Sequence, residues 1–283
     1  MSAGIPAEFR GGVIVAGAGV SGLGMAKLFA GIGVGVLVAD DSAAGRARAA
    51  AAGHRTASTA EARTHFNEVG AVVTSPGWRP DSPLLVDAAA ASLPVLGDVE
   101  ACYRLDRAGV FGPPRQWLVV TGTNGKTTTT GMLAAIMQRL GVETGRRASA
   151  CGNIGVAVAD ALTAPERIDV LVAELSSFQL YWSDQLTPDA GVLLNLADDH
   201  LDWHGSFANY AAAKARVLTA AHAVAGVDES RQHLLDELPI VPVGVEVRAP
   251  RLPGSRRPTG EGIGSHPGEL LHCVRDLPRH RIG

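Results

Sequence analysis

Short apolar runs alternate with alanine-rich stretches of helical composition along the first hundred residues. Apolar runs of this length are typical of buried parallel strands, and the stretches between them suit helices that cover the sheet. The predicted strands cover residues 13–17, 35–40, 71–77 and 94–98. The predicted helices cover residues 22–33, 42–53, 81–92 and 98–109. This alternation predicts a Rossmann-like, doubly wound α/β domain over residues 1–110.

A second alternation follows segment 110–116, whose paired prolines predict a linker. Further strands are predicted at residues 117–122, 169–175, 191–197 and 239–245, with helices at 126–141, 207–218 and 231–238. They predict a second α/β domain over residues 111–245. Residues 246–283 are rich in Arg, Pro, Gly and His and have no regular period, which predicts an irregular tail. A genuine tail and a shifted reading frame are both open explanations for this composition.

Composition and charge narrow the class of protein. The net charge of -3 gives no electrostatic reason to expect a nucleic-acid partner. Three scattered cysteines argue against a disulfide framework or a zinc cluster and fit a reducing compartment. The N-terminus has no apolar run behind a basic start, and no stretch approaches the roughly 18 apolar residues of a membrane span. We therefore expect a soluble, cytoplasmic protein without a membrane partner.

A first glycine-rich turn, "GAGVSGLG" at 17–24, follows a predicted strand and opens a predicted helix. Gly17, Gly19 and Gly22 fit the G-x-G-x-x-G pattern, and Asp40 and Asp41 lie about 20 residues further on, as a dinucleotide fingerprint requires. Such glycines let backbone N–H groups approach a diphosphate at the N-terminus of a helix. A nicotinamide cofactor, a UDP-sugar and a turn without a ligand all satisfy this pattern.

A second turn, "GTNGKTTTT" at 122–130, has the same strand-to-helix setting. The general phosphate-loop pattern expects a glycine at position 120, where this chain has valine, so the spacing is shorter. Gly122 and Gly125 would allow the backbone to wrap an anion, Lys126 would reach the β- and γ-phosphates, and Thr127 would place a hydroxyl on Mg²⁺. We therefore predict a P-loop-type ATP site here.

Two polar positions follow predicted strands downstream of this turn. Glu174 ends the apolar run "VLVA", where open α/β sheets collect ligands, and a carboxylate facing a triphosphate is a natural Mg²⁺ ligand. His200 lies in a polar segment for which the residues alone leave two interpretations open. One is a simple surface loop, and the less favoured one is a zinc site. The other polar members of this segment are Asp198, Asp199, Asp202 and His204.

Lys214 is one of only three lysines in a chain whose 25 basic residues are otherwise arginine, the others being Lys27 and Lys126. A lysine in an alanine-rich helix is ordinarily a solvated surface residue. In this chain an ordinary surface site would more often carry arginine, so a lysine at this position indicates a role beyond that of a surface cation. Lysine can lose its proton where arginine cannot, which gives Lys214 chemical options beyond those of a surface cation.

Taken together, the motifs resemble the Mur ligases of peptidoglycan synthesis over roughly residues 12–245. The residues that carry the resemblance are "GAGVSG" (17–22), "SPG" (75–77), "GDVE" (97–100), "GTNGKTTT" (122–129), "CGNIG" (151–155), "ELSSFQL" (174–180), "NLADDHLDWHG" (195–205) and "YAAAKARVL" (210–218). The similarity is greatest to the family branch that joins D-glutamate to UDP-N-acetylmuramoyl-L-alanine. Other branches, including the L-alanine-adding, diamino-acid-adding and folylpolyglutamate ligases, are the alternatives.

The resemblance implies a role for each matching residue. It implies that Lys214 is carbamylated by CO₂ and, with Glu174, Thr127 and His200, binds Mg²⁺. It also implies that Lys126, His200 and Lys214 act in catalysis. The ATP-binding residues would be Gly122, Thr123, Asn124, Gly125, Lys126, Thr127 and Thr128. The substrate-binding residues would be Val20, Ser21, Asp40 and Gly77 for the UDP moiety, and Asn153 and His200 for the muramoyl part.

The implied reaction is ATP-driven amide formation through an acyl phosphate, carried out by a monomer on small-molecule substrates. Family members also have a third domain that closes over ATP and holds the amino acid, and this chain ends before it. The second domain is accordingly expected to be incomplete. A ligase is one hypothesis, and a truncated relative that binds UDP-sugar or ATP with little or no turnover is the other.

Overall fold

The computed structural model describes residues 4–226 and 246–247, and its first sheet has five parallel strands. These are β1 (Val13–Ala16), β2 (Val36–Ala39), β3 (Arg55–Ala57), β4 (Ala71–Thr74) and β5 (Val95–Gly97), in the order β3-β2-β1-β4-β5. Strands β1 and β4 are buried along their whole length, as apolar runs in a parallel sheet covered on both faces should be. The order reverses between β1 and β4, so the crevice at their carboxyl ends is the expected ligand position.

The helices around these strands are α1 (Ala7–Arg10), α2 (Val20–Gly31), α3 (Ala43–Ala51), α4 (Thr59–Ala62), the 3₁₀ helix η1 (Arg63–Glu68), α5 (Pro83–Ala90) and α6 (Asp98–Arg107). The sequence predicts α2, α3, α5 and α6, whereas α1, α4 and η1 were not predicted. Ser58 and Glu61 form a reciprocal capping box that begins α4, and Pro83 occupies the first turn of α5, where its missing N–H costs nothing. Strand β3 was not predicted, because it is three residues long and largely polar.

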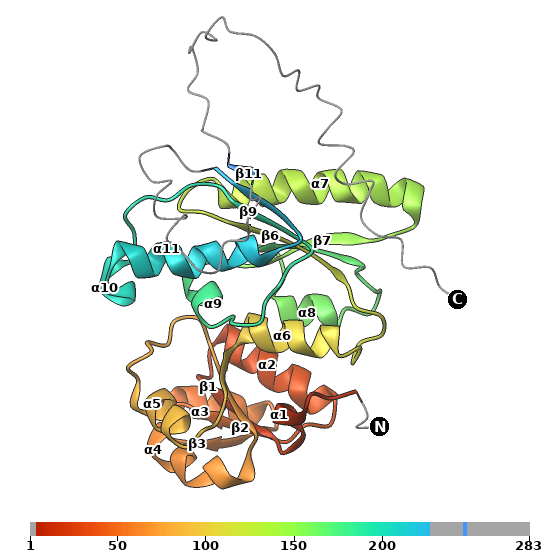
Figure 1. Ribbon diagram of the computed structural model, residues 1–283. Coiled ribbons are helices and arrows are strands. Elements are labelled where there is room, and N and C mark those ends of the chain that lie inside the picture. Colours follow the sequence, from red (N-terminus) through yellow and green to blue (C-terminus); the bar gives the residue numbers. More distant parts are fainter. Residues whose placement is uncertain (1–3, 227–245, 248–283) are drawn as a thin grey trace, which may run out of the picture. The chain divides into compact units, whose positions relative to one another are not determined.

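The second sheet has six parallel strands. These are β6 (Gln116–Thr121), β7 (Ala148–Gly152), β8 (Val170–Glu174), β9 (Ala190–Leu193), β10 (His222–Ala225) and β11 (Glu246–Val247), in the order β11-β10-β9-β6-β8-β7. The helices are α7 (Lys126–Thr144), α8 (Val158–Leu162), α9 (Ser177–Tyr181), α10 (Leu201–His204), α11 (Phe207–Ala215) and the 3₁₀ helix η2 (Arg216–Thr219). Figure 1 shows α7 on one face of this sheet and α8, α9 and α11 on the other. The predicted α/β class, with two parallel sheets, is thereby confirmed.

One hydrophobic core runs from the first sheet into the second. It includes Met25 of α2, Leu105 of α6, Trp117 of β6, Leu162 of α8 and Leu171 of β8, all nearly or fully buried. A second cluster fills the opposite face of the first sheet. Both sheets belong to one compact unit, and the proposed domain division at residue 110 stays a prediction.

The predicted linker at 110–116 ends in an anchored residue. Arg115 is buried and donates to the Asp106 carboxylate (2.7 Å) and to the carbonyls of Leu162 and Ile168 (both 2.9 Å). Trp117 Nε1 donates to the same carboxylate at 3.0 Å. The network satisfies both charges, which is the condition under which a buried ion pair is tolerated.

Three predictions fall outside the described residues. These are the helix at 231–238, the strand at 239–245 and the irregular tail at 246–283, of which only β11 is described. Among the helices that the structure describes, none is both long enough and apolar enough to cross a membrane.

Candidate nucleotide and substrate site

The loop between β6 and α7 adopts a conformation that its glycines make possible. Gly122 has φ 154° and Gly125 has φ 81°, both in the region that disfavours side chains. A Cβ at Gly122 would lie 2.9 Å from Leu194 Cβ, so this position is also closed sterically. Gly125 is the N-cap of the 19-residue helix α7, whose first free N–H groups face the loop. The predicted strand, glycine loop and helix are confirmed.

Asn195, which follows β9, fixes the shape of this loop. Its side chain accepts from Asn124 N at 2.9 Å and donates to Asn124 O at 3.0 Å, and its carbonyl accepts from Thr123 N at 3.1 Å. The Thr123 hydroxyl is hydrogen-bonded to the Tyr210 hydroxyl at 2.8 Å. Asn195 and Tyr210 are not among the predicted site residues, although both lie in the motifs that carry the family resemblance.

Glu174, at the carboxyl end of β8, connects two other predicted site residues. Its side chain is 1% exposed, which excludes a surface carboxylate. It accepts from Thr127 Oγ1 and from Asn153 Nδ2, each at 3.0 Å. Lys126, at the start of α7, donates from Nζ to Thr123 O at 2.8 Å and thus folds back over the loop. Thr128 is exposed on the same helix turn.

The donors around Glu174 suit Mg²⁺ rather than a soft metal. They are a buried carboxylate and a threonine hydroxyl beside a loop of phosphate-binding form, and Mg²⁺ takes one or two protein oxygens with substrate phosphates and water. Within residues 4–226 and 246–247 no group of three or more His, Cys, Asp or Glu side chains could hold a metal ion.

Lys214 points from α11 into the phosphate loop. It is 2% exposed, and its Nζ donates to Gly122 O at 2.8 Å and, more weakly, to Thr121 Oγ1 at 3.4 Å. The same Nζ lies 4.9 Å from the centre of the Tyr210 ring. The expectation that Lys214 is not an ordinary solvated lysine is borne out by this placement.

Burial, and to a smaller extent the neighbouring charge of Lys126, lower the pKa of Lys214 from 10.5 to about 7. Asp199 and Glu174 act in the opposite direction with smaller effects. At neutral pH a large fraction of the Lys214 side chains therefore carries a neutral amine, which is the nucleophilic form.

His200 lies at the rim of this site. It has φ 51° as the N-cap of α10, its Nε2 is 3.4 Å from an Asp199 carboxylate oxygen, and its ring packs on Phe178 at 4.6 Å. His204 is buried behind it, bonded to Ser177 Oγ at 3.0 Å, and desolvation lowers its pKa to about 4. The structure thus separates the two histidines into one exposed ring and one buried neutral ring.

The first glycine-rich turn is partly closed by the protein's own groups. The Asp40 carboxylate accepts from Ala18 N at 2.7 Å and from Ser42 N at 2.8 Å, and the Ser21 hydroxyl donates to Asp98. A Cβ at Gly22 would meet Gly17 O at 1.9 Å, which explains the glycine. Val20 is 89% exposed, and the space beside Gly77 is open. The ligand-binding roles predicted for these residues stay predictions.

Residues 120–238, which include the phosphate loop and strands β8 and β9, match the family described as the Mur ligase middle domain. The chain belongs to the Mur ligase family. It is 60% identical over 232 residues to the UDP-N-acetylmuramoylalanine--D-glutamate ligase of Corynebacterium diphtheriae, which covers 81% of this chain and 48% of that protein. The enzyme of the same name from Mycobacterium tuberculosis is 50% identical over 240 residues, or 84% and 47% of the two chains. The chain spans about half the length of the curated relatives it matches.

The solved structure of the UDP-N-acetylmuramate-alanine ligase from Thermotoga maritima is 20% identical in sequence, with a TM-score of 0.46. The alignment covers 79% of this chain and 51% of that one.

Proposed function

We propose that the protein acts in ATP-dependent addition of D-glutamate to UDP-N-acetylmuramoyl-L-alanine. The observation that carries the proposal is the buried Lys214 amine bonded to Gly122 O inside the glycine loop, on the same loop as Lys126. Lys126, which folds back over this loop, supplies a cation at a glycine-rich helix N-terminus and is suited to a polyanion such as a nucleoside triphosphate. The relatives at 50–60% identity carry names that state this ligase activity.

In this proposal the terminal carboxylate of the muramoyl substrate attacks the γ-phosphate of ATP, giving an acyl phosphate and ADP. The amine of D-glutamate then attacks the acyl carbon, and phosphate leaves. Lys126 and the α7 N–H groups stabilise the phosphate charge, while Asn153 and His200 orient the carboxylate. Mg²⁺, held by Glu174 and Thr127, would neutralise phosphate charge when bound.

We further propose that the neutral amine of Lys214 attacks CO₂ and releases one N–H proton to solvent, forming a carbamate that would complete the ligands of Mg²⁺. The first glycine-rich turn would hold the UDP moiety through Val20, Ser21, Asp40 and Gly77. A monomeric, cytoplasmic enzyme without nucleic-acid or membrane partners is part of the same proposal.

Titration of the full chain with Mg·ATP in a calorimeter tests the phosphate loop. Lys126→Ala should weaken binding by about tenfold to a hundredfold, because a hydrogen bond to a charged group contributes about 1.5–3 kcal/mol. Lys27→Ala removes an exposed lysine of α2 and serves as the matched control. Equal affinities for all three proteins would refute the assignment. Phosphate release that requires ATP, D-glutamate and UDP-N-acetylmuramoyl-L-alanine together tests the reaction.

A further inference from the structure

Segment 182–189, which connects α9 to β9, lies along one face of helix α6. Four contacts at helical spacing hold it there. They are Gly97 N to Trp182 O (3.0 Å), Gln185 N to Glu100 Oε1 (3.0 Å), Tyr103 hydroxyl to Thr187 O (2.8 Å) and Arg107 to the Asp189 carboxylate (2.8 Å). Positions three or four apart share a helix face, so the whole connection is attached to one stripe of α6.

Glu100 lies in the middle of this stripe and is fully buried. Its Oε1 accepts from Gln185 N at 3.0 Å and from Arg104 Nε at 2.8 Å, whereas Oε2 has no hydrogen-bond partner. Desolvation raises the pKa of this carboxyl. Burying a carboxylate with one oxygen unsatisfied costs free energy, so a purely stabilising role is better served by an uncharged side chain. This placement indicates that Glu100 serves to position segment 182–189 on α6.

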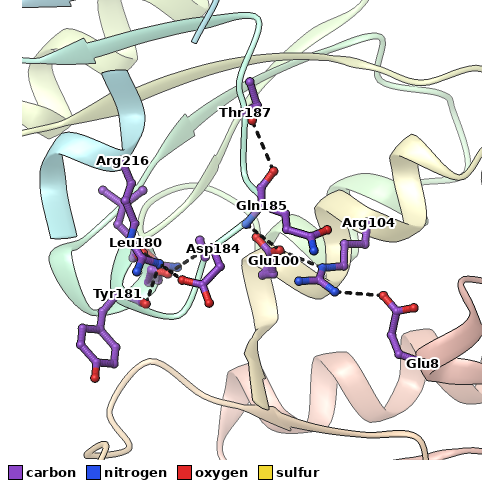
Figure 2. Close-up of polar contacts among 11 residues, drawn as sticks. Glu8, Glu100, Arg104, Leu180, Tyr181, Asp184, Gln185, Thr187 and Arg216 are labelled. Atoms are coloured by element: carbon purple, nitrogen blue, oxygen red, sulfur yellow. Dashed lines mark hydrogen bonds and ion pairs between the residues drawn. The ribbon is translucent and has the colours of Figure 1, made fainter. Parts of the chain in front are cut away.

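Arg104 extends the contact to the first helix of the chain. Its guanidinium also forms an ion pair with Glu8 of α1 at 3.1 Å, and both side chains are mostly buried. Figure 2 shows Glu8, Arg104, Glu100 and Gln185 in one continuous series of contacts. Arg104 and Glu100 therefore connect helix α1, helix α6 and segment 182–189, in addition to the other contacts between α6 and the segment.

One end of this assembly contacts the first glycine-rich turn, and the other end contacts a residue close in sequence to Lys214. At its first residue, α6 presents Asp98, which accepts from Ser21 in the first turn. At the other end, Asp184 forms an ion pair with Arg216, which also donates to Tyr181 O at 2.9 Å (Figure 2). Arg216 is two residues after Lys214, whose amine contacts the phosphate loop.

We propose that Glu100 is a positioning residue that sets the separation between the first glycine-rich turn and the phosphate loop, so that one elongated ligand reaches both. The inference rests on the proposed function, in which UDP-N-acetylmuramoyl-L-alanine is that ligand. In that function UDP alone would contact only the first turn, and Mg·ATP would contact only the second. Loss of the correct spacing should therefore weaken binding of UDP-N-acetylmuramoyl-L-alanine, the long ligand, and leave binding of the two short ligands, UDP and Mg·ATP, unaffected.

The experiment compares Kd values of the full chain for UDP, Mg·ATP and UDP-N-acetylmuramoyl-L-alanine. Glu100→Ala should weaken the long ligand about tenfold or more, since small misplacements have effects of this size, and should change the other two less than about twofold. Glu100→Gln keeps an acceptor for Gln185 N and should restore most of the affinity. Glu143→Ala, at an exposed ion pair with Arg139, is the matched control.

If Glu100→Ala weakened the binding of all three ligands equally, Glu100 would have a general structural role and the inference would be overturned. Unchanged affinity for all three ligands would also overturn it. Failure of the parent protein to bind any of the three would refute the proposed function and, with it, the inference. Hydrogen exchange gives a measurement that needs no ligand. In Glu100→Ala the Gln185 amide should exchange about tenfold faster while the β8 amides keep their rates, and an unchanged Gln185 amide would also overturn the inference.

Discussion

Replacing Lys214 with methionine tests the electrostatics of the candidate site most directly. The parent side chain has a pKa of about 7 when folded and an ordinary value of 10.5 when unfolded. Below pH 7 both states carry the proton, and the folded state bears the full cost of a buried charge. This cost is on the order of 5 kcal/mol, since each pH unit of difference corresponds to about 1.4 kcal/mol.

Between pH 7 and 10.5 the unfolded chain binds a proton on Lys214 that the folded chain has released. The free energy of unfolding of the parent therefore gains a positive contribution from this group as the pH rises. Lys214→Met removes that contribution. The variant should be more stable than the parent at pH 6, and its advantage should be about 3 kcal/mol smaller at pH 9. Loss of the bond to Gly122 O lowers the advantage at both pH values by a similar amount.

Urea unfolding at the two pH values measures this difference, under nitrogen so that no carbamate forms. Because the chain has only three lysines, ¹³C-labelled lysine gives three side-chain signals, and the one lost in Lys214→Met is identified at once. Its midpoint should lie near pH 7. Adding ¹³C-bicarbonate should then produce a carbamate signal that the variant lacks. A Lys214 midpoint near 10.5, or an advantage of the variant that does not change with pH, would refute the reasoning.

Two further predictions concern stability. Arg115→Met should lower the free energy of unfolding by about 3–5 kcal/mol, because the buried Asp106 carboxylate loses its cation; a loss below about 1 kcal/mol in urea unfolding would contradict the assigned network. Gly191→Ala should cost at least about 2 kcal/mol, since its Cβ would lie 2.0 Å from Val217 O. Gly131→Ala, in open space within α7, should instead stabilise the protein by up to about 1 kcal/mol. If thermal unfolding showed similar stability changes for Gly191→Ala and Gly131→Ala, the steric explanation would be ruled out.

The elements that the sequence predicted well are those with long apolar runs. Strands β1 and β8 begin and end within a residue or so of the predicted ranges, because their side chains are buried on both faces and leave a continuous apolar signal. Strands β7 and β10 were missed. Their sequences, "ASACG" and "HAVA", consist of small or mixed residues that carry no strand period, and their pairing with β8 and β9 determines their conformation.

The candidate site was predicted in its residues but not in its supporting contacts. Lys126, Glu174 and Lys214 are chemically distinctive, and each follows a recognisable strand or loop. Asn195 and Glu100 could not be ranked from the sequence, because their contacts join positions 71 and 85 residues apart. Such contacts depend on which loops the sheet order brings together, and local composition does not encode that order.

The continuous core between the two sheets has a consequence for synthesis of the chain. Helices α2 and α6 bury their apolar faces against α8, which spans Val158–Leu162 and belongs to the second sheet. A nascent chain that has emerged only through residue 110 therefore contains every strand of the first sheet, but its helices α2 and α6 are not yet covered by α8. Such a chain exposes the kind of apolar surface that chaperones bind and that promotes aggregation. The ribosome must deliver residues of the second sheet before the first one becomes stable, so the order of translation and the order of stable folding differ.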